Sequence, residues 1–575
     1  MKPLAIVKHL PSYKWMSEYR LSLFSGDLTA GIITAILLVP QAMAYSILAG
    51  LPPEIGLYAS IAPPILYAIF GSSRFLAVGP VAVASLMVAS ALGALATPGS
   101  PEYIASALIL SLLIGIILTL MGIAKLGFVA NFLSHPVMSG FTSAAAIVIA
   151  FSQIKHLFGL SIPSGARIDE TLMYLLQHTR DMNPTTILIG LTSIVLLLLL
   201  RQPLQLLLSR LKLSAGIVNG LVKAGPMLVV IIMTVASAGL LLNQTAGLAV
   251  VGAIPSGLPS LTIPEFDLAI WQKLASSAAL IALVSFVESI AIAQALASKR
   301  RQKIDVNQEL FGLGAANIGT AFTGGSPVCG GFSRSVVNYS AGANTQMAAI
   351  ITALIIALSV LFFTPFFYHL PQAVLAAIIV VSVLGLVDFK ALRVNWAYSK
   401  SDAISWLVTF AVVIAEGIEA GIVAGMLISI SLYLWRSSRP HIAVVGRVGQ
   451  SEHFRNINRH KVGTCPHVLA IRVDESLFFA NARYFENYLL SAVAEQPLVK
   501  DIVFICSAIN AIDGSALESL ETLVADLRSA GVTFNLAEVK GPVMDKLKNS
   551  DFLHHLEPGK VYLSTHDAFK DLKCV

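Results

Sequence analysis

The chain has 575 residues, of which 56% are hydrophobic and only 12% are charged, and its mean hydropathy is +0.78. A soluble domain of this length needs far more charge to cover its surface, so the composition predicts an α-helical polytopic membrane protein. The net charge of +6 is small for the length and does not have the size expected of a nucleic-acid-binding protein, so we expect no nucleic-acid partner.

The first 26 residues carry scattered charges and no short apolar stretch followed by a small-residue cleavage site. We expect residues 1–26 to be a retained cytosolic segment and not a signal peptide. Apolar runs then follow one another over residues 27–438, the expected transmembrane domain, since a spanning helix needs roughly 20 apolar residues. The clear spans are 28–48, 54–71, 104–123, 140–153, 184–200, 226–243, 276–298, 346–366, 372–387 and 404–434, the last long enough for two.

Lysine and arginine residues gather in every second connection between these spans, which is typical of cytoplasmic loops. The 154–183 connection has mixed charges and is the exception. The pattern therefore predicts that both termini are cytoplasmic, and we expect the membrane to be a bacterial inner membrane. The basic groups lie in the N-terminal arm and around Arg74, Lys125, 201–223, 299–303, 390–400 and 436–439.

Residues 439–575 have the charge density and patterning of a soluble domain. Predicted strands alternate there with predicted helices, which indicates a small cytosolic α/β domain. This domain is either a folded appendage or a regulatory module with a cytosolic protein partner. The strands are expected at 468–480, 501–513 and 532–539, and the helices at 516–531 and 542–550.

The four cysteines, Cys329, Cys465, Cys506 and Cys574, have no paired spacing. They predict neither a metal site nor a disulfide framework. The chain also has no nucleotide-binding loop and no nucleophile triad, so we expect no enzymatic activity and no cofactor. Any energy coupling is therefore expected to use an ion gradient and not ATP.

Two segments inside the membrane region are too short to cross it: RFLAVGPVAVASLMVAS (74–90) and SPVCGGFSRSVVNYSAG (326–342). Each has glycine or proline followed by roughly a dozen helix-compatible residues, about half a bilayer. Each comes third in its half of the chain, after two plausible spans, although 309–323 is a weak one. Paired interrupted helices in two repeats point to the midplane binding site of a transporter.

A half-helix has free N–H groups and about half a positive charge at its N-terminus. Two such ends facing each other would form an anion site with few side-chain donors. Pro80 suits the first helical turn, where a missing N–H costs nothing, and Gly330 and Gly331 would let an anion approach closely. The alternative is a pair of glycine-rich helices that pack tightly against their neighbours.

Four polar side chains are candidates for this site. Ser333 and Ser335 can donate hydroxyl hydrogen bonds, and Arg334 adds a fixed charge that is costly in a membrane unless it has a partner or a water-filled cavity. Glu288 lies in the middle of an apolar run and should be paired, hydrated or protonated there. It is either a proton-coupling site, a counter-charge for Arg334, or a structural acid bonded between helices.

Long stretches of the chain resemble the SulP family of sulfate permeases and related anion exchangers. The resemblance lies in residues 27–86, in FVESIA (286–291), in NQELFGLGAANIGTAFTGG (307–325) and in GGFSRSVVN (330–338). Residues 507–547 resemble a STAS domain, the usual cytosolic tail of the family. The resemblance implies about 14 segments in two inverted repeats of seven, a mobile core and a dimerising gate, and an elevator-like movement.

The resemblance also implies a set of functional residues. Glu288 matches an acid that resembles the coupling position of bacterial proton symporters, which favours protons as the co-ion. The substrate-binding residues are expected to be Gln41, Ala44, Tyr45, Val81, Ala82, Phe332, Ser333 and Arg334.

In the C-terminal domain, IDGSAL (512–517) resembles a motif of anti-sigma-factor antagonists, with Ser515 at the phosphorylated position. The alternative is that Asp513 or Ser515 caps the helix that follows.

The first hypothesis for function is proton-coupled sulfate uptake by a homodimer. The second changes the anion to bicarbonate, dicarboxylate or chloride, carried by transport or exchange. The third is a sensor in which the STAS domain gives the output, and the fourth is an anion channel. Backbone dipoles bind any small anion, so the sequence discriminates poorly among these substrates.

Overall fold

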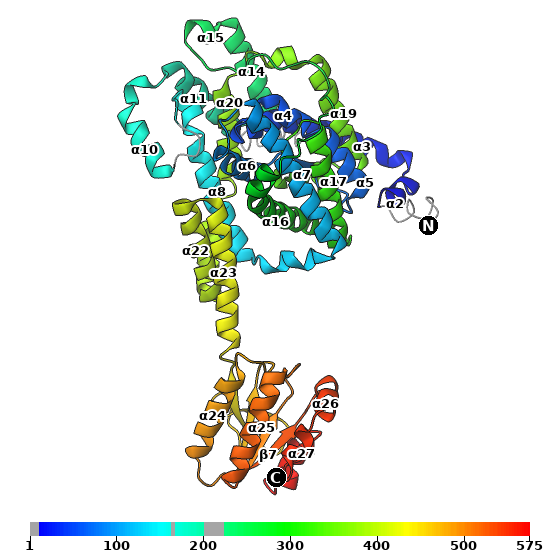
Figure 1. Ribbon diagram of the computed structural model, residues 1–575, viewed down its shortest axis with the longest axis vertical. Helices are drawn as coiled ribbons and strands as arrows, with labels where there is room; N and C mark the ends of the chain where they lie inside the picture. Colours follow the sequence, from blue (N-terminus) through cyan, green and yellow to red (C-terminus); the bar gives the residue numbers. More distant parts are fainter. Residues whose placement is uncertain (1–10, 163–166, 201–223) are drawn as a thin grey trace, which may run out of the picture. The chain divides into compact units, whose positions relative to one another are not determined.

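The computed structural model describes residues 11–162, 167–200 and 224–575 (Figure 1). The predicted basic connection 201–223, the first ten residues and part of the 154–183 connection lie outside the described residues. The chain divides into two compact units, 1–428 and 429–575. Each unit is described by itself below.

The membrane unit is helical, and its two halves contain corresponding series of helices. In the first half these are α3 (Leu21–Leu48), α4 (Pro53–Tyr58) with α5 (Ala62–Phe70), α6 (Ala82–Gly93), α7 (Pro101–Ile123), α8 (His135–Ser152), α11 (Pro184–Leu199) and α14 (Gly225–Gly239). In the second half these are α16 (Leu268–Lys299), α17 (Val306–Phe322), α18 (Phe332–Ser340), α19 (Met347–Phe362), α20 (Gln372–Leu384), α22 (Lys400–Glu416) and α23 (Ile418–Ser437).

Seven helical segments in the described residues are long and apolar enough to cross a membrane. The predicted 404–434 run is indeed two helices, because Gly417 interrupts it with a φ of +99°, a conformation that favours glycine. Helix α3 begins at Leu21, seven residues before the predicted span, because no glycine or proline lies between Leu21 and Gly26. Gly26 itself does not end the helix, and it packs closely against the backbone of Gly342.

The helices pack in two groups. In the first group, α17 packs against α7 and α5, α19 and α18 pack against α3, and α16 packs against α7 and α6 (Figure 1). In the second group, α8 packs against α22 and α20, and α11 packs against α20 and α14. Contacts of α20 and α14 with α3 join the groups. We refer to the first group as the core and to the second as the gate.

Two buried acids connect the halves of the membrane unit. The Asp27 carboxylate on α3 accepts hydrogen bonds from the backbone N–H groups of Asn344 and Thr345, at 2.6 and 3.0 Å, and from the Thr345 hydroxyl at 2.7 Å. The Glu309 carboxylate on α17 accepts four, from the Tyr67 hydroxyl at 2.6 Å and from the residues that follow α5. Each acid thus satisfies donors that lie more than 200 residues away in the sequence.

The C-terminal unit is an α/β sandwich around one six-stranded sheet of order β4-β3-β5-β6-β7-β8. Strands β5 to β8 are parallel, and β3 is antiparallel to both of its neighbours. The strands are β3 (Ile442–Arg447), β4 (Phe454–Asn456), β5 (Val468–Val473), β6 (Asp501–Ile505), β7 (Thr533–Ala537) and β8 (Val561–Tyr562). The helices are α24 (Ala482–Ala494), α25 (Gly514–Ser529), α26 (Gly541–Lys548), α27 (Phe552–Leu556) and α28 (Thr565–Asp571).

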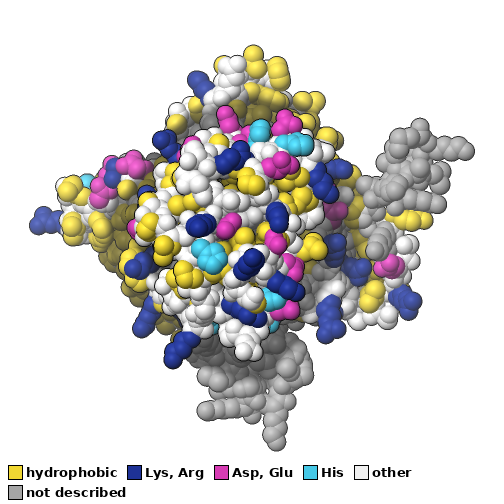
Figure 2. Space-filling view, turned by 90° about the horizontal axis from the view of Figure 1, so that it is seen from below, with side chains coloured by type: hydrophobic (Ala, Val, Ile, Leu, Met, Phe, Trp, Pro, Cys, Tyr) yellow, Lys and Arg dark blue, Asp and Glu magenta, His cyan; other side chains and the backbone are white. Residues whose placement is uncertain are grey.

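Side chains of β5 alternate between the two faces of this sheet, as the two-residue period of a strand requires. Leu469 and Ile471 join a core cluster with α24 and α25, whereas Val468 and Ala470 join one with Phe569 of α28. Charged and hydrophobic side chains are interspersed on the face seen in Figure 2. This is the patterning of a soluble α/β domain, as the sequence predicted.

The prediction that the cysteines form no disulfide is wrong. Cys465 and Cys574 are bonded, with their Cα atoms 5.7 Å apart and a sequence separation of 109. Helix α28 returns to the turn before β5, and this tertiary contact leaves no signal in the cysteine spacing. Cys329 and Cys506 are buried free thiols.

We expect Glu309→Ala to destabilise the membrane unit, because four donors lose their carboxylate acceptor and two of these hydrogen bonds are fully buried. Lost charge-assisted hydrogen bonds of this kind cost about 3 kcal/mol in total or more. The measurement is the free energy of unfolding of the detergent-solubilised protein. Glu265→Ala, at an exposed position, is the control and should change stability by less than about 0.5 kcal/mol. Equal stability of the two variants would contradict a structural role for Glu309.

Candidate functional site

A short two-stranded sheet holds the two predicted short segments together. Strand β1 (Val78–Gly79) pairs antiparallel with β2 (Cys329–Gly330), so that Val78 lies opposite Gly330 and Gly79 opposite Cys329. The Gly331 N–H extends the pairing by donating to the Ala77 carbonyl at 3.0 Å. Helix α6 begins three residues after β1, and α18 begins two residues after β2. The strand pair therefore places the N-termini of two short helices at one point.

Neither of these helix N-termini is capped by a side chain. The N-cap residues are Val81 for α6 and Gly331 for α18, both in extended conformation. The prediction that Pro80 occupies the first helical turn is wrong, because the chain stays extended through Val81 and the helix begins at Ala82. The first N–H groups of both helices remain available for a negatively charged ligand.

Arg334, in the first turn of α18, is only 2% exposed. Its Nη1 donates to the Pro80 carbonyl oxygen at 2.5 Å. Its Nε and Nη2 have no hydrogen-bond partner in the described protein. A buried guanidinium with unused N–H groups is costly, and an anion would satisfy both the charge and the donors.

Glycine makes room for this guanidinium. A Cβ atom at Gly331 would lie 2.7 Å from Arg334 Nη2 and 2.9 Å from its Nε. A Cβ atom at Gly79 would lie 3.4 Å from Nη2, an ordinary contact. The guanidinium of Arg334 therefore occupies space that a side chain at position 331 would need.

Polar side chains hold the strand pair from outside the site. The Ser335 hydroxyl accepts from the Ala77 N–H at 2.9 Å and donates to the Gly331 carbonyl at 2.7 Å, so it serves the fold and does not point to an anion as the sequence suggested. The Ser289 hydroxyl accepts from the Gly330 N–H at 2.8 Å. Asn338 Nδ2 donates to the Phe75 carbonyl at 3.1 Å. These bonds fix both extended segments independently of any ligand.

A cavity of about 60 Å³ lies at the two helix N-termini. It brings together all but one of the predicted substrate-binding residues and the predicted coupling residue, Glu288. Ala44 is the exception: it is fully buried and lines neither this cavity nor its neighbour. The predicted residues on the cavity wall are Gln41, Tyr45, Val81, Ala82, Glu288, Phe332, Ser333 and Arg334.

A second cavity of about 370 Å³ shares five lining residues with the first: Gln41, Phe332, Ser333, Ser382 and Leu386. Its remaining wall comes from Leu37 of α3 and from Val336 and Val337 of α18 in the core. In the gate it comes from the C-terminal half of α20, the C-terminal end of α11 and the N-terminal end of α14. The small cavity therefore continues into a wider space between core and gate.

Glu288 on α16 is half-buried and lines the same cavity as Arg334. Among the described residues, no ion pair within 4 Å joins the two side chains. The acid therefore faces the cavity without neutralising the arginine by direct contact.

The sequence did not indicate Ser382. This residue of α20 lines both cavities and brings the only hydroxyl of the gate that the described residues place on the smaller cavity wall. Its surroundings, AAIIVVSVLGLV, have the composition of an ordinary apolar span, and a lone serine there carries no local signal.

In the C-terminal unit, Asp513 caps α25: its carboxylate accepts from the Ala516 N–H at 2.8 Å. The capping alternative for the IDGSAL motif is thereby confirmed. Ser515 is exposed in the first turn of the same helix, and its phosphorylation stays a prediction.

Two repeats that meet at facing short helices, with a cavity at the crossing, define a polytopic transporter of the inverted-repeat class. The sequence model of the sulfate permease family matches residues 24–409, and that of the STAS domain matches residues 460–568. The chain belongs to the sulfate permease family. Its fold is the seven-plus-seven inverted repeat with core and gate, followed by a STAS domain.

Individual relatives agree with this assignment. The chain is 36% identical to sulfate transporter 4.1, chloroplastic, of Arabidopsis thaliana, over 97% of this chain and 82% of that protein. It is 32% identical to a probable sulfate transporter of Mycobacterium tuberculosis, over 97% of both. The solved structure of murine Slc26a9, an anion transporter in the inward-facing state, superposes with a TM-score of 0.90 at 23% identity, covering 100% of this chain and 96% of that one.

We expect Gly331→Ala to displace the Arg334 guanidinium and to weaken anion binding about tenfold, since roughly one charge-assisted hydrogen bond is lost. The φ of −96° at Gly331 suits alanine, so the backbone is not strained. The measurement is the dissociation constant of sulfate, used as a probe anion, for the purified protein. Gly79→Ala is the matched control and should change affinity much less. Equal losses in the two variants would show that the contact at Gly331 is not special.

Proposed function

We propose that the protein is a secondary transporter that carries sulfate into the cell together with protons. The observation that carries the proposal is the site at the crossing of the repeats. Two uncapped helix N-termini and two unpartnered N–H groups of the buried Arg334 converge there on one cavity. Such a site supplies positive potential and N–H donors, which suit a small anion that stays ionised.

The names of the relatives support sulfate as the anion, because the Arabidopsis and mycobacterial proteins are both described as sulfate transporters. A tetrahedral dianion has four oxygens and can accept from both helix ends and from Arg334 at once. Bicarbonate, dicarboxylates and chloride remain the alternatives, since backbone N–H groups bind small anions according to charge and size and discriminate little among their chemical types.

Glu288 supports proton coupling. A carboxyl group that shares the anion's cavity can bind a proton when the anion enters, so that less net charge crosses the bilayer. The membrane assigned is a bacterial inner membrane with both termini in the cytoplasm, in accord with the basic connections around Lys125, 299–303 and 390–400.

An elevator-like movement is supported by the distribution of the cavities. Besides the site, a cavity of about 560 Å³ is lined by the C-terminal ends of α3 and α6 and by the N-terminal residue of α20. The 370 Å³ cavity instead meets the C-terminal half of α20. The two spaces thus lie toward opposite ends of α20, and a sliding of core against gate would connect the site to each in turn. A homodimer and a cytosolic partner of the STAS domain complete the proposal.

We expect Arg334→Ala to reduce sulfate uptake into proteoliposomes at least tenfold, because it removes the fixed charge and two donors from the cavity. Labelled sulfate is added with an inward proton gradient, and unlabelled bicarbonate, succinate and chloride serve as competitors. Arg180→Ala, at an exposed position, is the control and should transport normally. Undiminished uptake by a folded Arg334→Ala protein would remove this residue from the site. Uptake of another anion in place of sulfate would keep the site and change the substrate.

Glu288→Gln should make sulfate flux independent of the proton gradient, because the amide keeps the shape of the side chain but cannot carry a proton. The check is the initial rate of uptake with and without a pH difference across the membrane, at fixed membrane potential. Glu265→Gln serves as the matched control. A gradient dependence that survives in Glu288→Gln would place the coupling elsewhere.

A further inference from the structure

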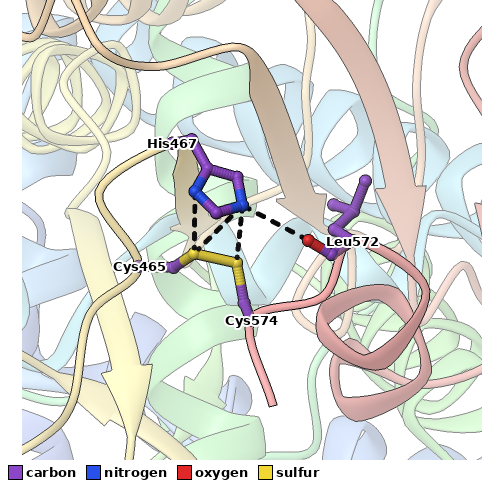
Figure 3. The surroundings of a disulfide bond; sticks show 4 residues. All are labelled: Cys465, His467, Leu572 and Cys574. Carbon is purple, nitrogen blue, oxygen red and sulfur yellow. Dashed lines mark hydrogen bonds between the residues drawn. A yellow bond between two sulfur atoms is a disulfide. The ribbon is translucent and has the colours of Figure 1, made fainter.

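Outside the membrane unit, two sulfurs and an imidazole converge in the C-terminal unit. Cys465 and His467 lie in the turn before β5, and Cys574 follows α28 (Figure 3). One potential ligand atom from each of the three residues lies within 4.8 Å of the others, and all three side chains are half-buried. In the described residues no other group of three histidines, cysteines or acids has this spacing.

The local backbone fixes the three residues. The Val468 N–H donates to the Cys465 carbonyl at 3.3 Å, which closes a tight turn around His467. Lys573 has a φ of +56°, and the Cys574 N–H donates to the Phe569 carbonyl at 2.8 Å, so the chain folds back at the end of α28. Phe569 itself is buried in the core cluster on that face of the sheet. Both arms of the cluster are therefore anchored in the fold and not only by the bond between the sulfurs.

The distances suit a tetrahedral metal site. His467 Nε2 lies 3.4 Å from Cys574 Sγ and 3.5 Å from Cys465 Sγ. With bonds of about 2.3 Å to sulfur and 2.0 to 2.1 Å to nitrogen, sulfur and nitrogen ligands of one zinc ion lie about 3.5 Å apart. The sulfurs need only separate to roughly 3.8 Å, the spacing of two thiolates on zinc. In the structure Nε2 also lies 3.3 Å from the Leu572 carbonyl oxygen.

The redox conditions of the compartment determine whether Cys465 and Cys574 form a disulfide or remain reduced thiols. Disulfides are rare in a reducing cytosol, where the same arrangement of cysteines and histidine more often binds metal. This step rests on the cytoplasmic topology proposed above for the C-terminal unit.

We propose that Cys465, His467 and Cys574 form a zinc site in the reduced protein and a disulfide in the oxidised protein. A dithiol reductant opens the disulfide: one of its thiolates attacks a cysteine sulfur, its second thiol releases the mixed disulfide, and the reductant leaves oxidised. The two cysteine thiols formed then bind Zn²⁺ and release two protons. Two thiolates and one imidazole are a ligand set that zinc accepts, and the fourth position is left for water or for a residue of a partner.

The site is tested on the full-length protein in detergent. Purified protein is reduced with a phosphine, freed of metal, desalted and titrated with Zn²⁺, and bound zinc is counted by elemental mass spectrometry. Co²⁺ in place of zinc gives a thiolate-to-metal charge-transfer band that reports the sulfur ligands directly. We expect one ion per reduced chain and none per diamide-oxidised chain.

Cys465→Ser and Cys574→Ser should each weaken binding at least tenfold, and His467→Gln should weaken it while keeping the cobalt–thiolate band. Cys506 is a buried free thiol that directly follows β6 in the same unit. Cys506→Ser is therefore the matched control and should bind zinc like the parent protein. Because His467→Gln retains both sulfurs, it distinguishes a lost ligand from a misfolded unit.

Thiols are also alkylated in intact cells before lysis, which reports the state of the pair where the protein works. Alkylation of both cysteines after zinc removal is the expected result. A pair that resists alkylation until reductant is added, or a reduced protein that binds no more zinc than the Cys465→Ser, Cys574→Ser double variant, would overturn the proposal. Neither result depends on sulfate flux, so the uptake assay can fail or succeed independently.

Discussion

The pairing of β1 with β2 is the contact on which the membrane unit depends. It consists of a few backbone hydrogen bonds between segments about 250 residues apart, and it is buried where no water can replace them. Because the strands end at this pair, α6 and α18 must begin there, and their N-terminal N–H groups and dipoles point at one cavity. The positive potential of the site is thus a consequence of interrupted secondary structure, and Arg334 adds to a potential that the backbone already provides.

The rest of the core keeps this arrangement in place. Ser289, Ser335 and Asn338 bond to the extended segments, and Asp27 and Glu309 bond to the connections that flank them. All five are polar groups in a membrane domain, where each pays a high desolvation cost unless its partners are complete. In most cases their partners belong to the other half of the membrane unit. These buried hydrogen bonds therefore specify how the two halves pack together.

The sequence predicted the fold and much of the cavity because the interruptions are visible as composition. Glycine and proline interrupt the apolar runs of the two short segments. Glu288 and Arg334 lie within the membrane region, where burying a charge has a high free-energy cost. The roles of Gln41, Tyr45, Val81, Ala82 and Phe332 followed only from the family resemblance, since these side chains are ordinary in an apolar helix. Ser382 and the Cys465–Cys574 bond had no signal at all, because each depends on a tertiary approach that no spacing encodes. Pro80 was misplaced because proline is equally suited to the extended residues before a helix and to its first turn.

The buried acids have a consequence for biogenesis. Asp27 and Glu309 find their donors at least 317 and 236 residues away in the sequence, so neither can be satisfied while only one repeat has been synthesised. While only the first half has been synthesised, the Asp27 carboxylate lacks its hydrogen-bond donors. Strand β1 likewise lacks the strand with which it pairs. The nascent protein therefore passes through a stage in which these polar groups lack their partners, and that stage ends only when strand β2 and residues 344 and 345 have been synthesised.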